Sequence, residues 1–181
     1  VGGGEGVDAG FAPDRSLADG AVIEGDGWQL EALHTPGHFG NHMAFALGDV
    51  LFSGDLVMGW ATSLVSPPDG DLTAFMSSLA RLASRRWQVF HPGHGAPVET
   101  PAERLETLAS HRRMREAQIL AALEDGASGA AGLAARIYTD TPPQLQSAAA
   151  RNVLAHLIDL AGRDLVTWRQ GTSETSVFSL A

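Results

Sequence analysis

Hydrophobic and polar residues alternate along two stretches early in the chain. Residues 21–23 and 28–32 flank a Gly-Asp-Gly turn, and residues 42–47 and 50–53 flank a turn at Gly48-Asp49. Alternation on both sides of a short Gly- and Asp-containing turn is typical of β-hairpins. We therefore predict four strands between residues 21 and 53. The Gly- and Asp-rich residues 1–20, which precede them, are predicted to form a loop or the edge of a broken element.

The hydrophobic spacing becomes helical beyond residue 70. An amphipathic helix over residues 71–84 is predicted by apolar residues at helical intervals, namely Leu72, Phe75, Met76, Leu79 and Leu82. Residues 87–90 follow as a short buried strand. The segment Thr100-Pro101-Ala102-Glu103 has the pattern of a helix-capping box with Pro at the first helical position. It predicts a long helix that ends at about residue 124.

The last third of the chain has the order of elements of a small winged-helix module. Residues 126–132 are rich in Ala, Gly and Ser and are predicted to form a linker. A short helix at 133–138, a second capping box at 141–144 with its helix, and a hairpin of 165–168 and 176–180 around Gln170-Gly171 follow. We therefore predict two domains, residues 1–125 and residues 126–181.

Composition restricts the classes of function. With 44% hydrophobic and 18% charged residues, the 181-residue chain suits a soluble globular protein, and no apolar run approaches the roughly 18 residues of a membrane span. The net charge of −9 argues against nucleic acid as a partner, and residues 126–181 contain four Arg against four acidic residues. The chain has no Cys, so any metal must be bound by His and carboxylates. A chain without Cys fits cytoplasm and periplasm, and we predict a cytoplasmic protein.

Three short segments place His or Asp beside Gly or Pro at the ends of predicted strands. They are His34-Thr35-Pro36-Gly37-His38, Phe52-Ser53-Gly54-Asp55 and His91-Pro92-Gly93-His94-Gly95. Loops at strand ends are where rigid sheets present functional groups, and imidazoles with a carboxylate suit a zinc or iron site. Each segment alone would be an ordinary turn, but their order and spacing are much more specific.

The series TPGH, SGD and PGHG resembles the later metal-binding motifs of the metallo-β-lactamase superfamily, in particular its glyoxalase-II-like and β-lactamase-like-2 hydrolases. The resemblance implies an α/β (α+β) fold, the second half of an αββα sandwich followed by a winged-helix extension. It also implies that His38 binds a first metal, that Asp55 bridges two metals and that His94 binds the second. His42 and His91 are candidates for contacting those ligands or the substrate.

The superfamily signature HxHxDH is absent, because none of the seven histidines forms a His-x-His or follows an Asp. In the family this motif precedes the segments found here and lies in the first half of the sandwich. We therefore expect a longer parent protein whose N-terminal half supplies it. The alternative is that a partner chain completes the sandwich.

For the complete parent the resemblance implies a hydrolase that uses metal-activated hydroxide on a small-molecule ester, thioester or related acyl substrate. Two zinc ions are expected, with iron or manganese as alternatives, and a homodimer is a further alternative. Competing interpretations are a catalytically inactive fragment or interaction module, and a metal-dependent phosphodiesterase or ribonuclease. Arg112, Arg113 and Arg115 on the long helix could contact an acidic leaving group, although a solvated helix face is the simpler interpretation.

Overall fold

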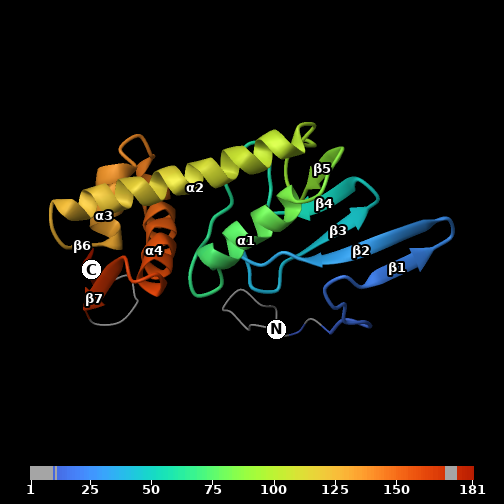
Figure 1. Ribbon diagram of the computed structural model, residues 1–181, viewed down its shortest axis with the longest axis horizontal. Helices are drawn as coiled ribbons and strands as arrows, with labels where there is room; N and C mark the ends of the chain where they lie inside the picture. Colours follow the sequence, from blue (N-terminus) through green and yellow to red (C-terminus); the bar gives the residue numbers. More distant parts are fainter. Residues whose placement is uncertain (1–9, 11, 170–174) are drawn as a thin grey trace. The chain divides into compact units, whose positions relative to one another are not determined.

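The computed structural model describes residues 10, 12–169 and 175–181, which form two compact units (Figure 1). The described residues up to Ser63, together with Pro68–Ala109, form unit 1. Unit 2 consists of Leu64–Pro67 and the described residues from Ser110 onward. The elements follow one another as β1 (Val22–Gly25), β2 (Trp28–His34), β3 (Met43–Leu47), β4 (Val50–Gly54), α1 (Leu72–Ala83), β5 (Val89–Pro92), α2 (Pro101–Glu124), β6 (Ser128–Gly129), α3 (Ala130–Ile137), η1 (Pro143–Leu145), α4 (Gln146–Gly162), β7 (Val166–Arg169) and β8 (Val177–Leu180).

Unit 1 contains a five-stranded sheet in the order β1-β2-β3-β4-β5. Neighbours are antiparallel from β1 to β4, which confirms both predicted hairpins, whereas β4 and β5 are parallel. It follows that β2, β4 and β5 run in the same direction and end at one edge of the sheet. These are the strands that the three motif segments follow, so the topology gathers the motifs at that edge.

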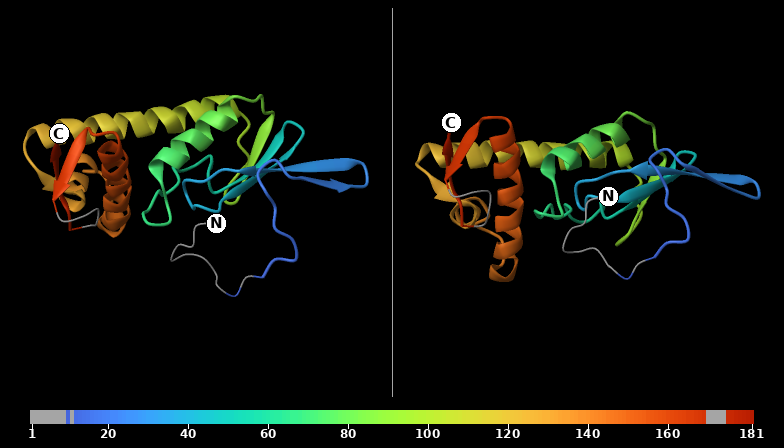
Figure 2. Two further views of the ribbon diagram at one scale, coloured as in Figure 1. Left: turned by 60° about the horizontal axis from the view of Figure 1, so that its bottom comes forward. Right: turned by 90° about the horizontal axis from the view of Figure 1, so that it is seen from below.

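Helix α1 lies along one face of the sheet (Figures 1 and 2). Asp71 begins it, with extended backbone and a side-chain oxygen that accepts a hydrogen bond from Ala74 N at 2.7 Å. The buried positions Leu72, Phe75, Ser78, Leu79 and Leu82 form its inner stripe, as the helical spacing predicts. Just beyond the helix, Arg85 reaches Glu31 on β2 at 2.7 Å.

The other face of the sheet is apolar and partly exposed. Strand pairing aligns Ala32, Phe45, Phe52 and His91 across it, while Trp28 and Leu47 share this face by alternation. Trp28 is 47% exposed, Leu47 39% and Phe52 44%. We call this surface the open face. Large apolar side chains in a row on one sheet face are typical of a surface that another layer covers.

Unit 2 is built around α3 and α4 with a three-stranded sheet in the order β6-β8-β7. Its core contains the buried side chains of Ile119, Leu133, Val153, Leu157 and Phe178. Two expectations need correction: residues 126–132 contain β6 and the start of α3 rather than an irregular linker, and β6 adds a third strand to the predicted hairpin. The turn predicted at Gln170-Gly171 lies outside the described residues.

An arginine and a histidine are buried inside unit 2. Arg112, only 2% exposed, donates from Nη1 to Oδ1 of Asn152 at 3.0 Å, and Val65 N donates to the same oxygen at 3.1 Å. Burial lowers the pKa of Arg112 to about 10. The solvated helix face expected for the arginine cluster is therefore wrong at Arg112. His156 is 1% exposed, and neither ring nitrogen has a hydrogen-bond partner among the described residues.

The two units divide the chain at Ser110, inside α2, and not at residue 125. The domain boundary predicted from the sequence stays a prediction, because compact contact units and folding domains need not coincide. No helix formed by residues 10, 12–169 and 175–181 is both long and apolar enough to cross a membrane.

Candidate metal centre

Asp55 and His94 lie beside each other at the edge where β4 and β5 end. Oδ2 of Asp55 is 3.5 Å from Nε2 of His94, and the His94 side chain is 71% exposed whereas that of Asp55 is 32% exposed. Oδ1 of Asp55 is buried and has no hydrogen-bond partner among the described residues. A buried carboxylate oxygen without a donor is costly unless a cation or hydrogen-bond donor binds it.

Glycine at two positions makes this arrangement possible. An ideal Cβ on Gly93 would lie 2.6 Å from Asp55 Oδ1, so a side chain at this position would displace the carboxylate from its present place. Gly93 N donates to Gly54 O at 2.9 Å and joins the two motif segments. Gly54 has a φ of 53°, and a Cβ there would lie 2.6 Å from Nε2 of His42. The glycines of SGD and PGHG therefore allow side chains to approach the backbone closely, in addition to allowing the turns.

His42 reaches the same edge as a half-buried, neutral imidazole. Its Nδ1 is 2.9 Å from Oγ1 of Thr35, a residue that is completely buried. Burial first, and then the neighbouring charge of His38, lower the pKa of His42 to about 4. A hydrogen bond to Thr35 and the charge of Asp55 act in the opposite direction. Near neutral pH the ring is therefore uncharged, the form in which imidazole binds metals.

The TPGH segment, which carries His38, is fixed against α1. Gly37 has a φ of 137°, and a Cβ there would lie 2.3 Å from the Cα of Phe75. Asp71 N donates to Gly37 O at 2.9 Å, and Ser78 Oγ donates to Pro36 O at 2.7 Å. The helix and the motif segment therefore meet through backbone contacts that no residue larger than glycine would permit.

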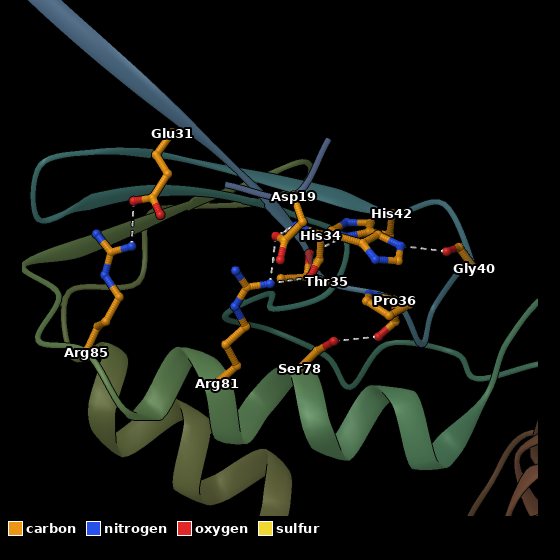
Figure 3. A network of polar contacts seen from close by, with 10 residues as sticks. All are labelled: Asp19, Glu31, His34, Thr35, Pro36, Gly40, His42, Ser78, Arg81 and Arg85. Atoms are coloured by element: carbon orange, nitrogen blue, oxygen red, sulfur yellow. Dashed lines mark hydrogen bonds and ion pairs between the residues drawn. The ribbon is translucent and has the colours of Figure 1, made fainter. Parts of the chain in front are cut away.

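A polar network beside this contact holds the end of β2 (Figure 3). Arg81 points from α1 toward the strand, where its Nη1 donates to Asp19 Oδ1 at 2.8 Å and to His34 O at 2.9 Å. The hydrogen bond from Arg81 is the main cause that lowers the pKa of Asp19. Nε2 of His34 lies 2.9 Å from Gly40 O, so His34 closes the motif loop and has a structural role.

His91 lies on β5 and stacks on Phe52 of β4, with ring centroids 5.6 Å apart and an angle of 30° between the planes. It is therefore on the open face, one residue before the turn that leads to His94. His38 makes an edge-to-face contact with Phe39 at 4.6 Å. The metal roles of His38, Asp55 and His94, and the supporting roles of His42 and His91, stay predictions.

The described His and Asp side chains at this edge are of the types that bind metal ions, but they are too few to form a complete site. Neutral imidazole and carboxylate are the ligands that zinc and similar ions take in proteins. Among the described residues, however, no three His, Asp or Glu side chains group closely enough to hold an ion. The Asp55–His94 pair, with its unsatisfied carboxylate oxygen, has the chemistry of a metal-binding pair, but an ion bound there would need further ligands.

The segment from Asp55 to Ser63, which we call the post-SGD loop, was not identified from the sequence as part of this region. Arg104 on α2 donates from Nε to Met58 O at 2.7 Å and from Nη2 to Ala61 O at 2.6 Å. Oγ of Ser63 lies within hydrogen-bond distance of the carbonyl oxygens of Asp55 and Leu56. The Arg104 contacts join positions 46 and 43 residues apart and leave no local pattern to recognise.

Comparison with known proteins identifies the family. The family model of the metallo-beta-lactamase superfamily matches residues 3–119, and that of the beta-lactamase associated winged helix domain matches residues 130–172. The Beta-lactamase-like protein 2 homolog of Drosophila melanogaster is 34% identical over 148 residues, which are 80% of this chain and 49% of the relative. An atrochrysone carboxyl ACP thioesterase of Aspergillus fumigatus is 34% identical over 120 residues, 64% of this chain and 37% of the relative.

Solved structures agree with this assignment. A metallo-beta-lactamase family protein from Thermus thermophilus has a TM-score of 0.78 at 29% identity, covering 91% of this chain and 54% of that one. A beta-lactamase domain protein from Burkholderia ambifaria shares the fold, with a TM-score of 0.84 at 22% identity and coverage of 94% and 54%. The chain thus spans about half the length, or less, of the relatives it matches. It belongs to the metallo-β-lactamase superfamily and carries the winged-helix domain associated with that fold.

Proposed function

We propose that the complete protein is a metal-dependent hydrolase that cleaves ester, thioester or related acyl bonds. The observation that carries the proposal is the Asp55–His94 pair, in which Oδ1 of Asp55 is buried and has no hydrogen-bond partner among the described residues. Membership of the superfamily supports the class of reaction. The pair lies at the strand-end edge, where a rigid sheet can present it to a substrate.

In this proposal His38, Asp55 and His94 hold one side of a centre of two ions, most simply zinc, with iron or manganese as alternatives. The remaining ligands come from the part of the fold that the relatives contain beyond this chain's matched region. Such ions, when bound, lower the pKa of a coordinated water and polarise the scissile carbonyl. Neutral His42, held by Thr35, would orient the ligands or substrate beside it.

An acyl substrate is favoured over a phosphodiester for two reasons. One relative at 34% identity is named as an acyl carrier protein thioesterase. The net charge of −9 opposes the approach of a polyanion such as RNA. We therefore propose a small-molecule acyl compound as substrate.

The open face supports the view that another layer belongs on this sheet. Trp28, Leu47 and Phe52 together expose an apolar surface that would favour association. We propose that the other half of the sandwich packs there, from the same polypeptide or from a partner chain. An environment-sensitive dye such as ANS should bind this 19.0 kDa chain alone and bind the complete protein much less.

The test compares Asp55→Asn with Asp14→Asn in the complete, zinc-loaded protein. Both exchange a carboxylate for an amide, but Asp14 is exposed and outside the site. Asp55→Asn should remove bound zinc, measured by elemental analysis, and lower thioester hydrolysis by about 100-fold or more, because residues that merely support metal ligands are worth about 10- to 100-fold. Asp14→Asn should leave both unchanged. Full activity and metal content in Asp55→Asn would refute the proposal, and cleavage of bis(p-nitrophenyl) phosphate alone would favour a phosphodiesterase.

For this chain taken by itself we propose no catalysis. The motivating observation is that the described residues contain no group of three metal-binding side chains. Two ligands leave an ion mostly solvated and weakly bound. Zinc titration of the 19.0 kDa chain should therefore show much weaker binding than titration of the complete protein, and equal affinity would contradict this.

A further inference from the structure

The side chain of Trp60 stands out at the candidate site. It is 71% exposed, whereas Leu56 and Val57, earlier in the post-SGD loop, are completely buried. A large aromatic ring left in water is unfavourable and is often a contact surface. The indole nevertheless lies next to the PGHG segment, because its Nε1 is 3.4 Å from His94 O.

Gly95 lets the indole ring approach that segment closely. It has a φ of 93°, and an ideal Cβ there would lie 2.6 Å from Cδ1 of Trp60. Any larger residue would push the ring away. The edge of the indole therefore rests on the His94-Gly95 backbone, while Trp60 as a whole stays 71% exposed.

The backbone on both sides of Trp60 is fixed. Arg104 donates to the carbonyl oxygens of Met58 and Ala61, which flank the Gly59-Trp60 pair. Ser53 Oγ donates to Val57 O at 2.8 Å and holds the start of the loop. Binding to an exposed aromatic side chain whose backbone is already held loses less conformational entropy than binding to one on a loose segment.

Trp60 is also distinct from the open face. The exposed aromatic Phe52 belongs to β4 and points outward by strand alternation, whereas Trp60 lies in the loop beyond the end of that strand. A layer that covers the sheet need not cover this loop. In this chain the indole is exposed to a molecule that approaches the strand-end edge.

We propose that Trp60 determines substrate specificity by stacking on a flat aromatic acyl group of the molecule bound beside Asp55 and His94. The inference rests on the proposed hydrolase function and adds to it the class of acyl group. Indole and aryl faces attract each other in addition to the apolar area that they bury. A small acyl group such as acetyl is too short to use this surface.

The test uses the complete, zinc-loaded protein with phenylacetyl and acetyl thioesters of N-acetylcysteamine, which share one leaving group. Trp60→Ala should lower kcat/KM for the phenylacetyl thioester by about 10- to 100-fold, the scale of a lost apolar contact, and leave the acetyl thioester within about threefold. Trp60→Phe should retain most of the preference. The matched control Trp168→Ala, at an exposed tryptophan of unit 2, should change neither rate. Equal losses for both thioesters, or no loss, would overturn the inference.

A second measurement does not depend on turnover. Calorimetric titration should show that phenylacetate binds the wild type more tightly than acetate does, and that Trp60→Ala removes the difference. Acrylamide should quench the fluorescence that distinguishes wild type from Trp60→Phe, because the indole is exposed. If neither thioester is cleaved but phenylacetate still binds through Trp60, the hydrolase proposal fails and the aromatic surface stands. If the Trp60 indole is shielded from acrylamide in the complete protein, Trp60 is not an accessible contact surface and the inference fails.

Discussion

Lowering the pH from 7 to 5 should destabilise unit 2 through His156. This side chain is 1% exposed on α4, and its pKa is lowered to about 3, first by burial and then by the charges of Arg112, His111, Arg163 and Arg115. The unfolded chain has the ordinary histidine pKa of about 6.5. Below that pH the unfolded state binds a proton at this histidine, whereas the native state does not. The contribution of neutral His156 to the free energy of unfolding is therefore fully present above pH 6.5 and is lost as the pH falls toward 3.

The magnitude follows from these two pKa values. One pH unit of differential protonation is worth about 1.4 kcal/mol, and at pH 5 the unfolded histidine is almost fully charged. Between pH 7 and pH 5 the linkage amounts to about 2 kcal/mol. Replacing His156 with Leu should abolish this part of the pH dependence. At pH 7 the substitution should be neutral or stabilising, because it removes two buried ring nitrogens that lack partners among the described residues.

Urea unfolding of wild type and His156→Leu at both pH values measures the effect. The loss on acidification should be about 2 kcal/mol larger in the wild type. Leu157→Ala, a change at a fully buried neighbour, serves as control and should cost about 2–5 kcal/mol at both pH values while keeping the wild-type pH dependence. The reasoning is refuted if His156→Leu has the same pH dependence as the wild type, or if proton NMR shows His156 titrating near its ordinary pKa of about 6.5 in the folded protein.

Three further substitutions test the scaffold around the site. Gly37→Ala should destabilise unit 1 by about 3 kcal/mol or more in urea unfolding, because its Cβ would overlap Phe75, whereas Gly40→Ala, with open space around it, should change stability by less than about 1 kcal/mol. Asp71→Ala should cost about 1 kcal/mol by removing the cap of α1, and a loss larger than about 2 kcal/mol would contradict a simple capping role. Arg104→Met should speed backbone amide exchange throughout the post-SGD loop, since two carbonyl oxygens lose their donor; unchanged exchange would show that other contacts hold the loop.

Local patterns predicted the parts of the fold that local forces determine. The Gly-Asp turns predicted both hairpins, and the spacing from Leu72 to Leu82 predicted α1. Three glycine-containing motifs at strand ends indicated the edge where Asp55 and His94 meet. In each case the information lies within a few residues of the element it specifies.

What the sequence did not reveal depends on contacts between distant residues. Arginine is usually exposed, so no pattern indicated that Arg112 is buried against Asn152, 40 positions away. Arg104 reaches carbonyl oxygens 46 and 43 positions earlier, and main-chain acceptors carry no sequence signature. Trp60 carries no sequence signal, because one aromatic residue in a loop has no periodicity. Its contact with Gly95 exists only in the folded chain, which brings the two residues together.

The discontinuity of unit 2 has a consequence for how the chain folds during synthesis. Leu64–Pro67 belongs to this unit, and Val65 is completely buried there and donates to Asn152, 87 residues later. Arg151 likewise donates to Ser66 Oγ and, at 3.0 Å, to Pro67 O. These four residues leave the ribosome long before α4 exists, and at about 5–20 residues per second they wait on the order of 4–17 s for their partners. Unit 2 therefore completes its core only after α4 has been synthesised, and a winged-helix segment expressed without residues 64–67 would lack part of its own interior.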